Sequence, residues 1–255
     1  MKIDAVLSPK ELPALATRDL RATACVVFDV LRATSAFVTA LHNGAKEIIP
    51  VSEISEALEI KKKRPDVLLG GERNGVRISA GGIDFDLGNS PREFVPEKVR
   101  GKTIVSTTTN GTRALRACAN AKAILAVSLL NLEATAKFLQ RHNFENILIV
   151  CAGTYENAAQ EDILAAGATC ELLSAREVLA DGHRPRPIFS DSAQIAFRAF
   201  MQAKSDLSAA ICDSANARRL LSIPELRDDV SFCLQRDIFP LVARAEGDGI
   251  IRLDH

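Results

Sequence analysis

An acid, an arginine and two hydroxyl side chains follow one short apolar segment near the amino terminus. After CVVF (25–28) come Asp29, Arg32, Thr34 and Ser35. A guanidinium offers planar donors that match phosphate, sulfonate or carboxylate, and hydroxyls can cap a helix whose free N–H groups face an anion. The carboxylate of Asp29 could bind Mg²⁺ or attack phosphorus directly. The pattern predicts an anion site, although a plain Asp29–Arg32 ion pair beside a helix cap would give the same residues.

A second polar turn, TTTNGTR (107–113), has the composition of an anion-binding loop. Asn110, Gly111 and Thr112 stand where an apolar strand is expected to give way to a helix, and the backbone donors of such a turn can surround an anion. A ligand-free polar turn with Asn-Gly would look the same. The loop is not a Walker A motif, because the G-x-x-x-x-G-K-[ST] spacing is missing. We expect this turn to bind substrate together with the first one.

Three more acidic residues could join Asp29 around a metal ion. Glu72 lies in a glycine-flanked loop, GGERNG, while Glu161 and Asp162 open a helix that follows the apolar segment NILIVC (146–151). The helix dipole alone favours acids at a helix start, which is the ordinary explanation for the last two. As ligands, the three carboxylates would supply the hard oxygens that Mg²⁺ prefers.

Two further arginines and one polar pair are candidates for contacts with substrate. Arg73 or Arg113 could hold a second acidic group of a substrate. Asn89 and Ser90 could donate hydrogen bonds to an anion, although Ser90 also begins a capping box with proline at the first helical position. We therefore expect a helix to start after Ser90.

Cysteine and histidine give one alternative site. The six cysteines and four histidines lack CxxC, HxH or HExxH spacing, which disfavours zinc. Cys151 ends an apolar segment in VCAG and is a plausible nucleophilic thiol. An aspartate at one strand end and a cysteine at another loosely resembles the isochorismatase-like cysteine hydrolases, an analogy at the level of the fold.

Apolar strands alternate with helices along the chain, which predicts an α/β fold. The sheet should be parallel or mixed and covered on both faces, with ligands bound outside the carboxyl ends of its strands. An amphipathic helix is expected over 35–43, and a further helix near 174–181. The segment AKEIIPVS (45–52) matches AKAILAVS (121–128) at an offset of 76 residues, so two βαβ repeats, approximately 24–65 and 100–142, are expected within a single domain, 1–255.

Composition narrows the class of protein. The chain has 255 residues, 47% of them apolar, with Lys+Arg 32 balanced by Asp+Glu 32. This balance disfavours nucleic acid and anionic membranes as partners, and no apolar run approaches the ~18 residues of a membrane span. We expect a soluble, cytoplasmic protein; the sequence leaves open whether it forms a homo-oligomer.

Taken in order, the motifs DVLRATS, GGERNG, LGNSPREF, TTTNGT and QEDILAAG resemble those of the ComB family, the 2-phosphosulfolactate phosphatases. The resemblance implies a three-layer α/β/α fold with two similar intertwined halves. It also implies an Mg²⁺-dependent phosphatase that converts 2-phospho-3-sulfolactate to 3-sulfolactate and phosphate in coenzyme M biosynthesis. A different small phosphorylated acid is an open alternative for the substrate.

The motifs and the resemblance together give one set of expected site residues. The catalytic pair is Asp29 and Arg32. The expected substrate-binding residues are Thr34, Ser35, Arg73, Asn89, Ser90, Asn110, Gly111 and Thr112. The expected Mg²⁺ ligands are Asp29, Glu72, Glu161 and Asp162. The competing interpretations are a cysteine hydrolase that uses Cys151 and a non-catalytic protein that binds small phosphorylated acids.

Overall fold

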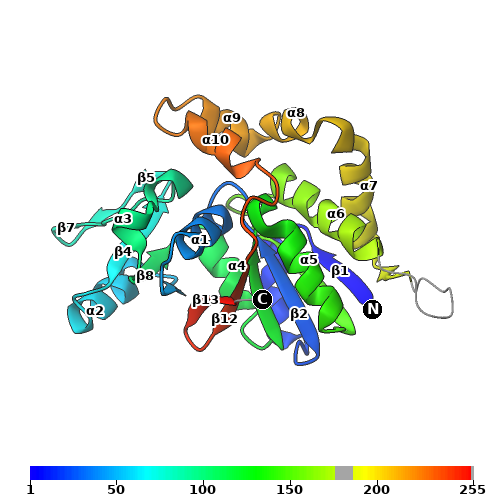
Figure 1. Ribbon diagram of the computed structural model, residues 1–255, viewed down its shortest axis with the longest axis horizontal. Helices are drawn as coiled ribbons and strands as arrows, with labels where there is room; N and C mark the ends of the chain where they lie inside the picture. The colour runs from blue at the N-terminus through cyan, green and yellow to red at the C-terminus, as the bar shows by residue number, and fades with distance from the viewer. Residues whose placement is uncertain (176–185, 254–255) are drawn as a thin grey trace.

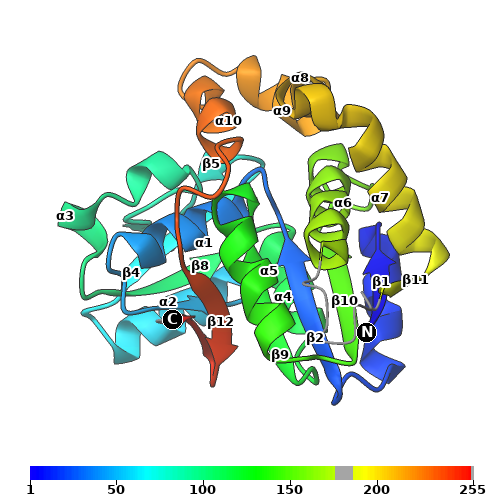
Figure 2. The same ribbon diagram turned by 45° about the vertical axis from the view of Figure 1, so that its right-hand side comes forward.

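A computed structural model describes residues 1–175 and 186–253, and it contains a large mixed sheet flanked by helices (Figures 1 and 2). The α/β prediction is therefore confirmed. The 11-stranded sheet has the order β11-β1-β10-β2-β9-β12-β13-β3-β8-β4-β5, and a separate ribbon pairs β6 with β7. The strands are β1 (Lys2–Val6), β2 (Thr23–Phe28), β3 (Glu47–Pro50), β4 (Leu68–Arg73), β5 (Val76–Arg77), β6 (Ser79–Ala80), β7 (Ile83–Asp84), β8 (Thr103–Thr107), β9 (Ala123–Val127), β10 (Asn146–Cys151), β11 (Ile188–Phe189), β12 (Val242–Glu246) and β13 (Gly249–Leu253).

Helices cover the sheet and close one end of the molecule. In both views α8, α9 and α10 form an arm that arches over the ends of the central strands (Figures 1 and 2). The α-helices are α1 (Ala33–His42), α2 (Ile54–Lys63), α3 (Pro96–Val99), α4 (Gly111–Ala117), α5 (Leu132–Arg141), α6 (Gln160–Ser174), α7 (Asp191–Ala203), α8 (Leu207–Cys212), α9 (Ala215–Leu221) and α10 (Arg227–Cys233). The short 3₁₀ segments are η1 (Pro9–Thr17), η2 (Pro91–Glu93), η3 (Leu129–Asn131) and η4 (Lys204–Asp206). The helix predicted near 174–181 falls almost wholly outside the described residues.

The sheet consists of two parallel groups of strands joined by an antiparallel hairpin. In one group β2 lies between β10 and β9, and in the other β8 lies between β3 and β4. The β12–β13 hairpin pairs with β9 on one side and β3 on the other. Helix α1 connects β2 to β3, and α4 connects β8 to β9, so both connections cross between the groups. The strands of the two predicted repeats thus pair with each other rather than within each βαβ unit, because alternation in sequence does not specify which strands become neighbours.

Strand β2 is buried on both faces, which explains its continuous apolar sequence. Val26 and Phe28 belong to the core beneath α5, α6 and α7, whereas Cys25 and Val27 belong to the core beneath α1 and α4. Helix α1 was predicted to be amphipathic, yet every residue from Ala33 to Leu41 is buried. The helix lies between other elements on all sides, so no polar face is needed.

The predicted capping box at Ser90 does not form. Only the 3₁₀ turn η2 follows, and the Ser90 hydroxyl makes no cap hydrogen bond. The Glu93 carboxylate instead accepts from the Gly88 amide at 3.0 Å and pairs with Arg77. The Ser90 hydroxyl is therefore available for a different hydrogen bond.

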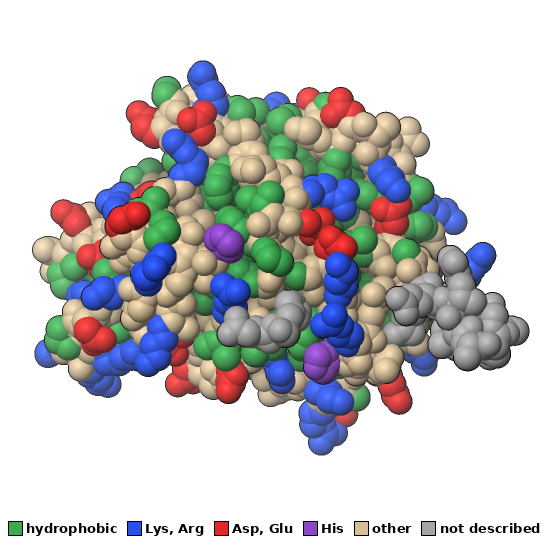
Figure 3. All heavy atoms as spheres, in the orientation of Figure 1, with side chains coloured by type: hydrophobic (Ala, Val, Ile, Leu, Met, Phe, Trp, Pro, Cys, Tyr) green, Lys and Arg blue, Asp and Glu red, His purple; other side chains and the backbone are tan. Residues whose placement is uncertain are grey.

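The surface carries charges of both signs. On the face shown in Figure 3, Lys and Arg side chains are interspersed with Asp and Glu side chains. Within the described residues, no helix has both the length and the apolar character that a bilayer crossing requires.

Candidate active site

The polar turns after β2 and β8 meet the end of β4 and the loop after β10 at one small polar cavity. Glu72 of β4 accepts hydrogen bonds from the amide and hydroxyl of Thr109, at 3.0 and 2.9 Å. The Asn110 amide oxygen accepts from the Tyr155 backbone N–H at 3.0 Å. The cavity has a volume of about 30 Å³ and almost entirely polar walls. A larger groove of about 530 Å³ lies beside α2, α4 and the β12–β13 hairpin, and its lining contains none of the predicted site residues.

Asp29 is buried at the cavity wall, directly after β2. Its Oδ1 accepts a hydrogen bond from the Ala33 amide at 3.1 Å. The pKa of Asp29 is raised to about 7, chiefly by burial and also by the charges of Glu72 and Glu161, while the bond from Ala33 and the charge of Arg32 lower it. A Cβ at Gly111 would lie 2.8 Å from Asp29 Oδ2 and 2.7 Å from the Ala33 side chain, so only glycine fits there. A nearby cation would therefore stabilise the ionised form of this carboxylate.

Glu161 and Asp162 are adjacent but bonded differently. Glu161 Oε1 accepts from the Asn216 side chain at 3.0 Å, whereas its Oε2 is buried without a partner among the described residues. Both oxygens of Asp162 accept backbone hydrogen bonds, from Val30 at 2.8 Å and from Gly153 at 3.0 Å. Burial and the neighbouring acids nevertheless raise the pKa of Asp162 well above its ordinary value. Asp162 thus links the loops after β2 and β10 through hydrogen bonds. This is a structural role and differs from the predicted role as a metal ligand.

The predicted four-acid metal cluster is not formed by the described residues, in which no three His, Cys, Asp or Glu side chains are placed to hold a metal ion. Glu72 is engaged as well, because its second oxygen accepts from the Gly75 amide at 2.6 Å. Asp29 Oδ2 and the unpartnered Glu161 Oε2 are the carboxylate oxygens that remain. Mg²⁺ is commonly bound by one or two carboxylates together with water and substrate phosphate, so this pair fits an ion that is held jointly with substrate.

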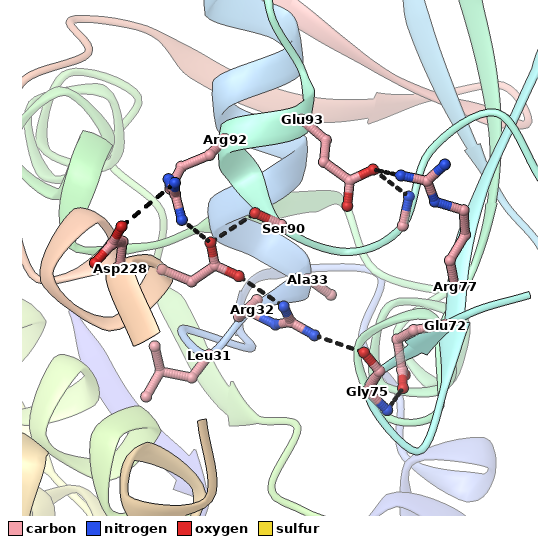
Figure 4. Close-up of polar contacts among 12 residues, drawn as sticks. Leu31, Arg32, Ala33, Glu72, Gly75, Arg77, Ser90, Arg92, Glu93 and Asp228 are labelled. Atoms are coloured by element: carbon pink, nitrogen blue, oxygen red, sulfur yellow. Dashed lines mark hydrogen bonds and ion pairs between the residues drawn. The ribbon is translucent and has the colours of Figure 1, made fainter. Parts of the chain in front are cut away.

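Arg32 is bound by an acid that the sequence analysis missed. Its Nη1 lies 2.7 Å from Oδ2 of Asp229 on α10, and both side chains are almost completely buried. Its Nη2 donates to the Gly75 carbonyl at 3.4 Å, toward the loop after β4 (Figure 4). Asp229 also accepts a 2.6 Å hydrogen bond from Ser90 and lies 3.6 Å from Arg92. The alternative Asp29–Arg32 ion pair does not form; Asp229 instead fixes Arg32 and Ser90 from the other end of the chain.

The hydroxyls predicted to bind substrate stabilise the turns instead. Thr34 Oγ1 donates to the Asp29 carbonyl at 3.0 Å, and Ser35 Oγ donates to the Val30 carbonyl at 2.7 Å. Thr112 bonds in the same way to Thr108. The amides of Ala33 and Thr34, at the start of α1, both donate to Asp29. These groups therefore shape the loop around Asp29, and the amides of Ala33 and Thr34 are occupied by the protein itself.

Five of the predicted residues line the cavity: Asp29, Arg32, Glu72, Asn89 and Asn110. The two arginines proposed for a second anion lie elsewhere. Arg73 donates to the Ser52 carbonyl at 3.1 Å and to the Thr107 hydroxyl at 2.9 Å. Arg113 pairs with Glu156 at the surface.

The lining also includes five residues with polar side chains that the sequence analysis missed: Asn74, Thr154, Tyr155, Asn216 and Arg219. Among the described residues, three buried side-chain polar atoms have no hydrogen-bond partner, namely Thr154 Oγ1, Glu161 Oε2 and Arg219 Nε. Two of them belong to lining residues, and the third belongs to an acid that is bonded to lining residue Asn216. Native proteins rarely leave buried polar atoms unpaired, so their concentration here indicates a ligand site. The sequence signal was slight: Asn216 and Arg219 share one face of a helix by their spacing.

Cys151 is not placed to act as a nucleophile. It is fully buried at the end of β10, and burial raises the pKa of its thiol well above the ordinary value. A thiol in that state supplies almost no thiolate at neutral pH. The cysteine-hydrolase alternative is therefore disfavoured.

Removing this thiol should leave catalysis intact. We expect Cys151→Ala to keep a kcat/KM close to that of the wild type, with a loss of about 1 kcal/mol in the free energy of unfolding from the lost buried sulfur. Phosphate release and urea denaturation would measure the two effects, with Cys212→Ala, at a half-buried site, as the control. The cysteine mechanism would be supported if the Cys151→Ala protein folded but lost its activity while the Cys212→Ala protein kept it.

Comparison with known proteins identifies the family. The family model described as 2-phosphosulpholactate phosphatase matches residues 7–248. A relative from Caldanaerobacter subterraneus subsp. tengcongensis, named "Probable 2-phosphosulfolactate phosphatase", is 42% identical over 92% of each chain. Proteins of the same name from Thermotoga petrophila (43% identical, 85% of this chain and 86% of the relative) and Clostridium acetobutylicum (34%, 95% and 96%) also match. The chain belongs to the 2-phosphosulfolactate phosphatase family.

Proposed function

We propose that the protein hydrolyses the phosphate monoester of a small sulfonated or carboxylated hydroxy acid, with 2-phosphosulfolactate as substrate. The observation that supports this most directly is the set of unpartnered buried polar atoms around Asp29, which lies in the first of the motifs shared with the family. The names of the relatives supply the chemical class of the substrate. A role in coenzyme M biosynthesis in the cytoplasm is part of the same proposal.

Asp29 is the residue with the direct chemical role. Its Oδ1 is held by the Ala33 amide, and its Oδ2 has no protein donor in the described part of the chain. That oxygen can act on phosphorus as a nucleophile or bind the metal ion. Either way, the carboxylate must be ionised, which its raised pKa of about 7 opposes unless a cation lies beside it.

Arg32 orients and stabilises the transferred group. Asp229 fixes one side of its guanidinium, while Nη2 points to the loop at Gly75 that forms part of the cavity wall. Donors fixed before the reaction stabilise developing negative charge without reorganisation. Bound Mg²⁺, held by Asp29 and Glu161, would supply the Lewis acidity that offsets charge on the phosphoryl oxygens.

The direct test is phosphate release from 2-phosphosulfolactate, measured with added Mg²⁺ and after treatment with EDTA. We expect turnover with Mg²⁺, loss of activity in EDTA, and recovery when Mg²⁺ is restored. A panel of phospholactate-type esters would define the substrate. If these esters bound by calorimetry and released no phosphate, the protein would be a binding protein. Undiminished turnover in EDTA would contradict only the metal requirement.

A further inference from the structure

We propose that Arg219 of α9 binds the second anionic group of the substrate, the sulfonate or carboxylate, while Arg32 and the acids act on the phosphate. This assignment rests on the proposed function, and it replaces Arg73 and Arg113, whose side chains are engaged outside the cavity. It makes Arg219 the residue that distinguishes an acidic substrate from a simple phosphate monoester.

The Arg219 guanidinium is fixed at the cavity wall. Its Nη2 donates to the Asn216 side-chain oxygen at 2.8 Å, and its Nε is buried without a partner in the described residues. The Nη1 atom packs against Gly75, where a Cβ would lie only 2.8 Å away. Asn216 in turn donates to Glu161 at 3.0 Å and to the Leu31 carbonyl at 2.6 Å. Asn216 therefore holds the guanidinium beside the catalytic acids. Some of the guanidinium N–H groups are not used within the described part of the protein and can donate to a ligand.

The two arginines of the cavity differ in how their charges are balanced. Arg32 pairs with Asp229 at 2.7 Å, so most of its charge is compensated within the protein. Arg219 makes no ion pair with any carboxylate of residues 1–175 and 186–253. Both guanidiniums contact Gly75, Arg32 at the carbonyl and Arg219 near the Cα. The cavity thus has two guanidinium groups close to the same residue, and the uncompensated one suits an anion that the substrate brings.

A bidentate guanidinium matches the planar oxygen pairs of a carboxylate and two of the three oxygens of a sulfonate. A lysine at this position would keep the positive charge but lose the planar pair of N–H donors. The structure therefore predicts that affinity for the acidic group depends on both charge and geometry at position 219.

The test compares Arg219→Gln and Arg219→Lys with wild type on two substrates, 2-phosphosulfolactate and phenyl phosphate, which lacks a second anion. We expect Arg219→Gln to raise KM for 2-phosphosulfolactate about tenfold to a hundredfold with little change in kcat, and to affect phenyl phosphate hydrolysis far less. Arg219→Lys should recover part of the loss. Arg218→Gln is the matched control, because Arg218 is the exposed neighbour on α9 and donates to the Asp213 carbonyl.

A binding measurement separates this inference from the activity. Calorimetry with 3-sulfolactate, which carries no phosphate, should detect binding to the metal-free wild type and weaker binding to Arg219→Gln, at unchanged melting temperature. An equal loss on both phosphate esters would overturn the inference, since Arg219 would then act on the phosphate or on the fold. A wild-type protein that hydrolyses neither ester would instead overturn the proposed function, and unimpaired 3-sulfolactate binding by Arg219→Gln would overturn the inference independently.

Discussion

Asp29→Asn is expected to reduce kcat/KM by roughly a thousandfold or more, because the substitution removes the carboxylate that either attacks phosphorus or binds the metal ion. The isosteric amide can keep the hydrogen bond from the Ala33 amide, so the loop should stay in place. Phosphate release with saturating Mg²⁺ would measure the loss. Activity near that of the wild type would show that Asp29 has no direct role.

The same substitution should stabilise the metal-free protein at alkaline pH. The pKa of Asp29 rises from its ordinary value of 3.8 to about 7 in the folded protein, so the folded state binds a proton that the unfolded state has already released. The contribution of this group to stability therefore falls as the pH rises from about 4 through 7. An asparagine carries no such penalty. At pH 8 without metal, we expect a higher melting temperature for Asp29→Asn than for wild type, and near equality at pH 4.

Added Mg²⁺ should reverse this order. A cation beside the ionised carboxylate removes the penalty, so Mg²⁺ should raise the melting temperature of the wild type more at pH 8 than at pH 5. The Asp29→Asn protein should respond weakly at both pH values. Thermal denaturation across pH, with and without Mg²⁺, measures all of these effects. A variant that is less stable than wild type at pH 8 without metal would contradict the electrostatic account.

Asp229→Ala is expected to destabilise the protein by about 3–5 kcal/mol, because it leaves the buried Arg32 guanidinium without its counter-ion. Ser90 would lose its acceptor at the same time. The remaining folded protein should show a much reduced kcat/KM, since Arg32 would no longer be held at the cavity wall. Urea denaturation and phosphate release measure the two effects.

The neighbouring acid provides the control. Asp228 is 69% exposed and pairs with Arg92 at 3.4 Å, an ion pair at the surface. We expect Asp228→Ala to change the free energy of unfolding by less than about 1 kcal/mol and to leave kcat/KM near the wild-type value. Equal effects of the two substitutions would mean that the buried ion pair has no special importance.

The sequence predicted those parts of the site that follow strand ends. Asp29, Glu72 and Asn110 stand beside apolar strands or glycines, and such turns meet at ligand sites in α/β proteins. Asp229 and Arg219 lie 200 and 190 residues along the chain from Asp29, on short helices whose charged residues resemble ordinary solvent-exposed ones. Only the packed structure brings Arg219 to the cavity and Asp229 to Arg32, because no local pattern records a contact across that separation.

The hydroxyls of the first turn show a different limit. Thr34 and Ser35 have the composition of a helix cap, but a hydroxyl bonds to whichever acceptor the backbone places nearest, here the carbonyls of Asp29 and Val30. Strand pairing has the same limit: the α/β class followed from alternation, whereas the exchange of strands between the two repeats depends on the packing of α1 and α4.

The partnership of Arg32 with Asp229 has a consequence for synthesis on the ribosome. Arg32 is translated almost two hundred residues before its counter-ion on α10. Until α10 has been translated, a nascent chain has to keep Arg32 in contact with water, because an unpaired guanidinium is too costly to bury. The burial of Arg32 beside Asp229 therefore has to wait until α10 has been made.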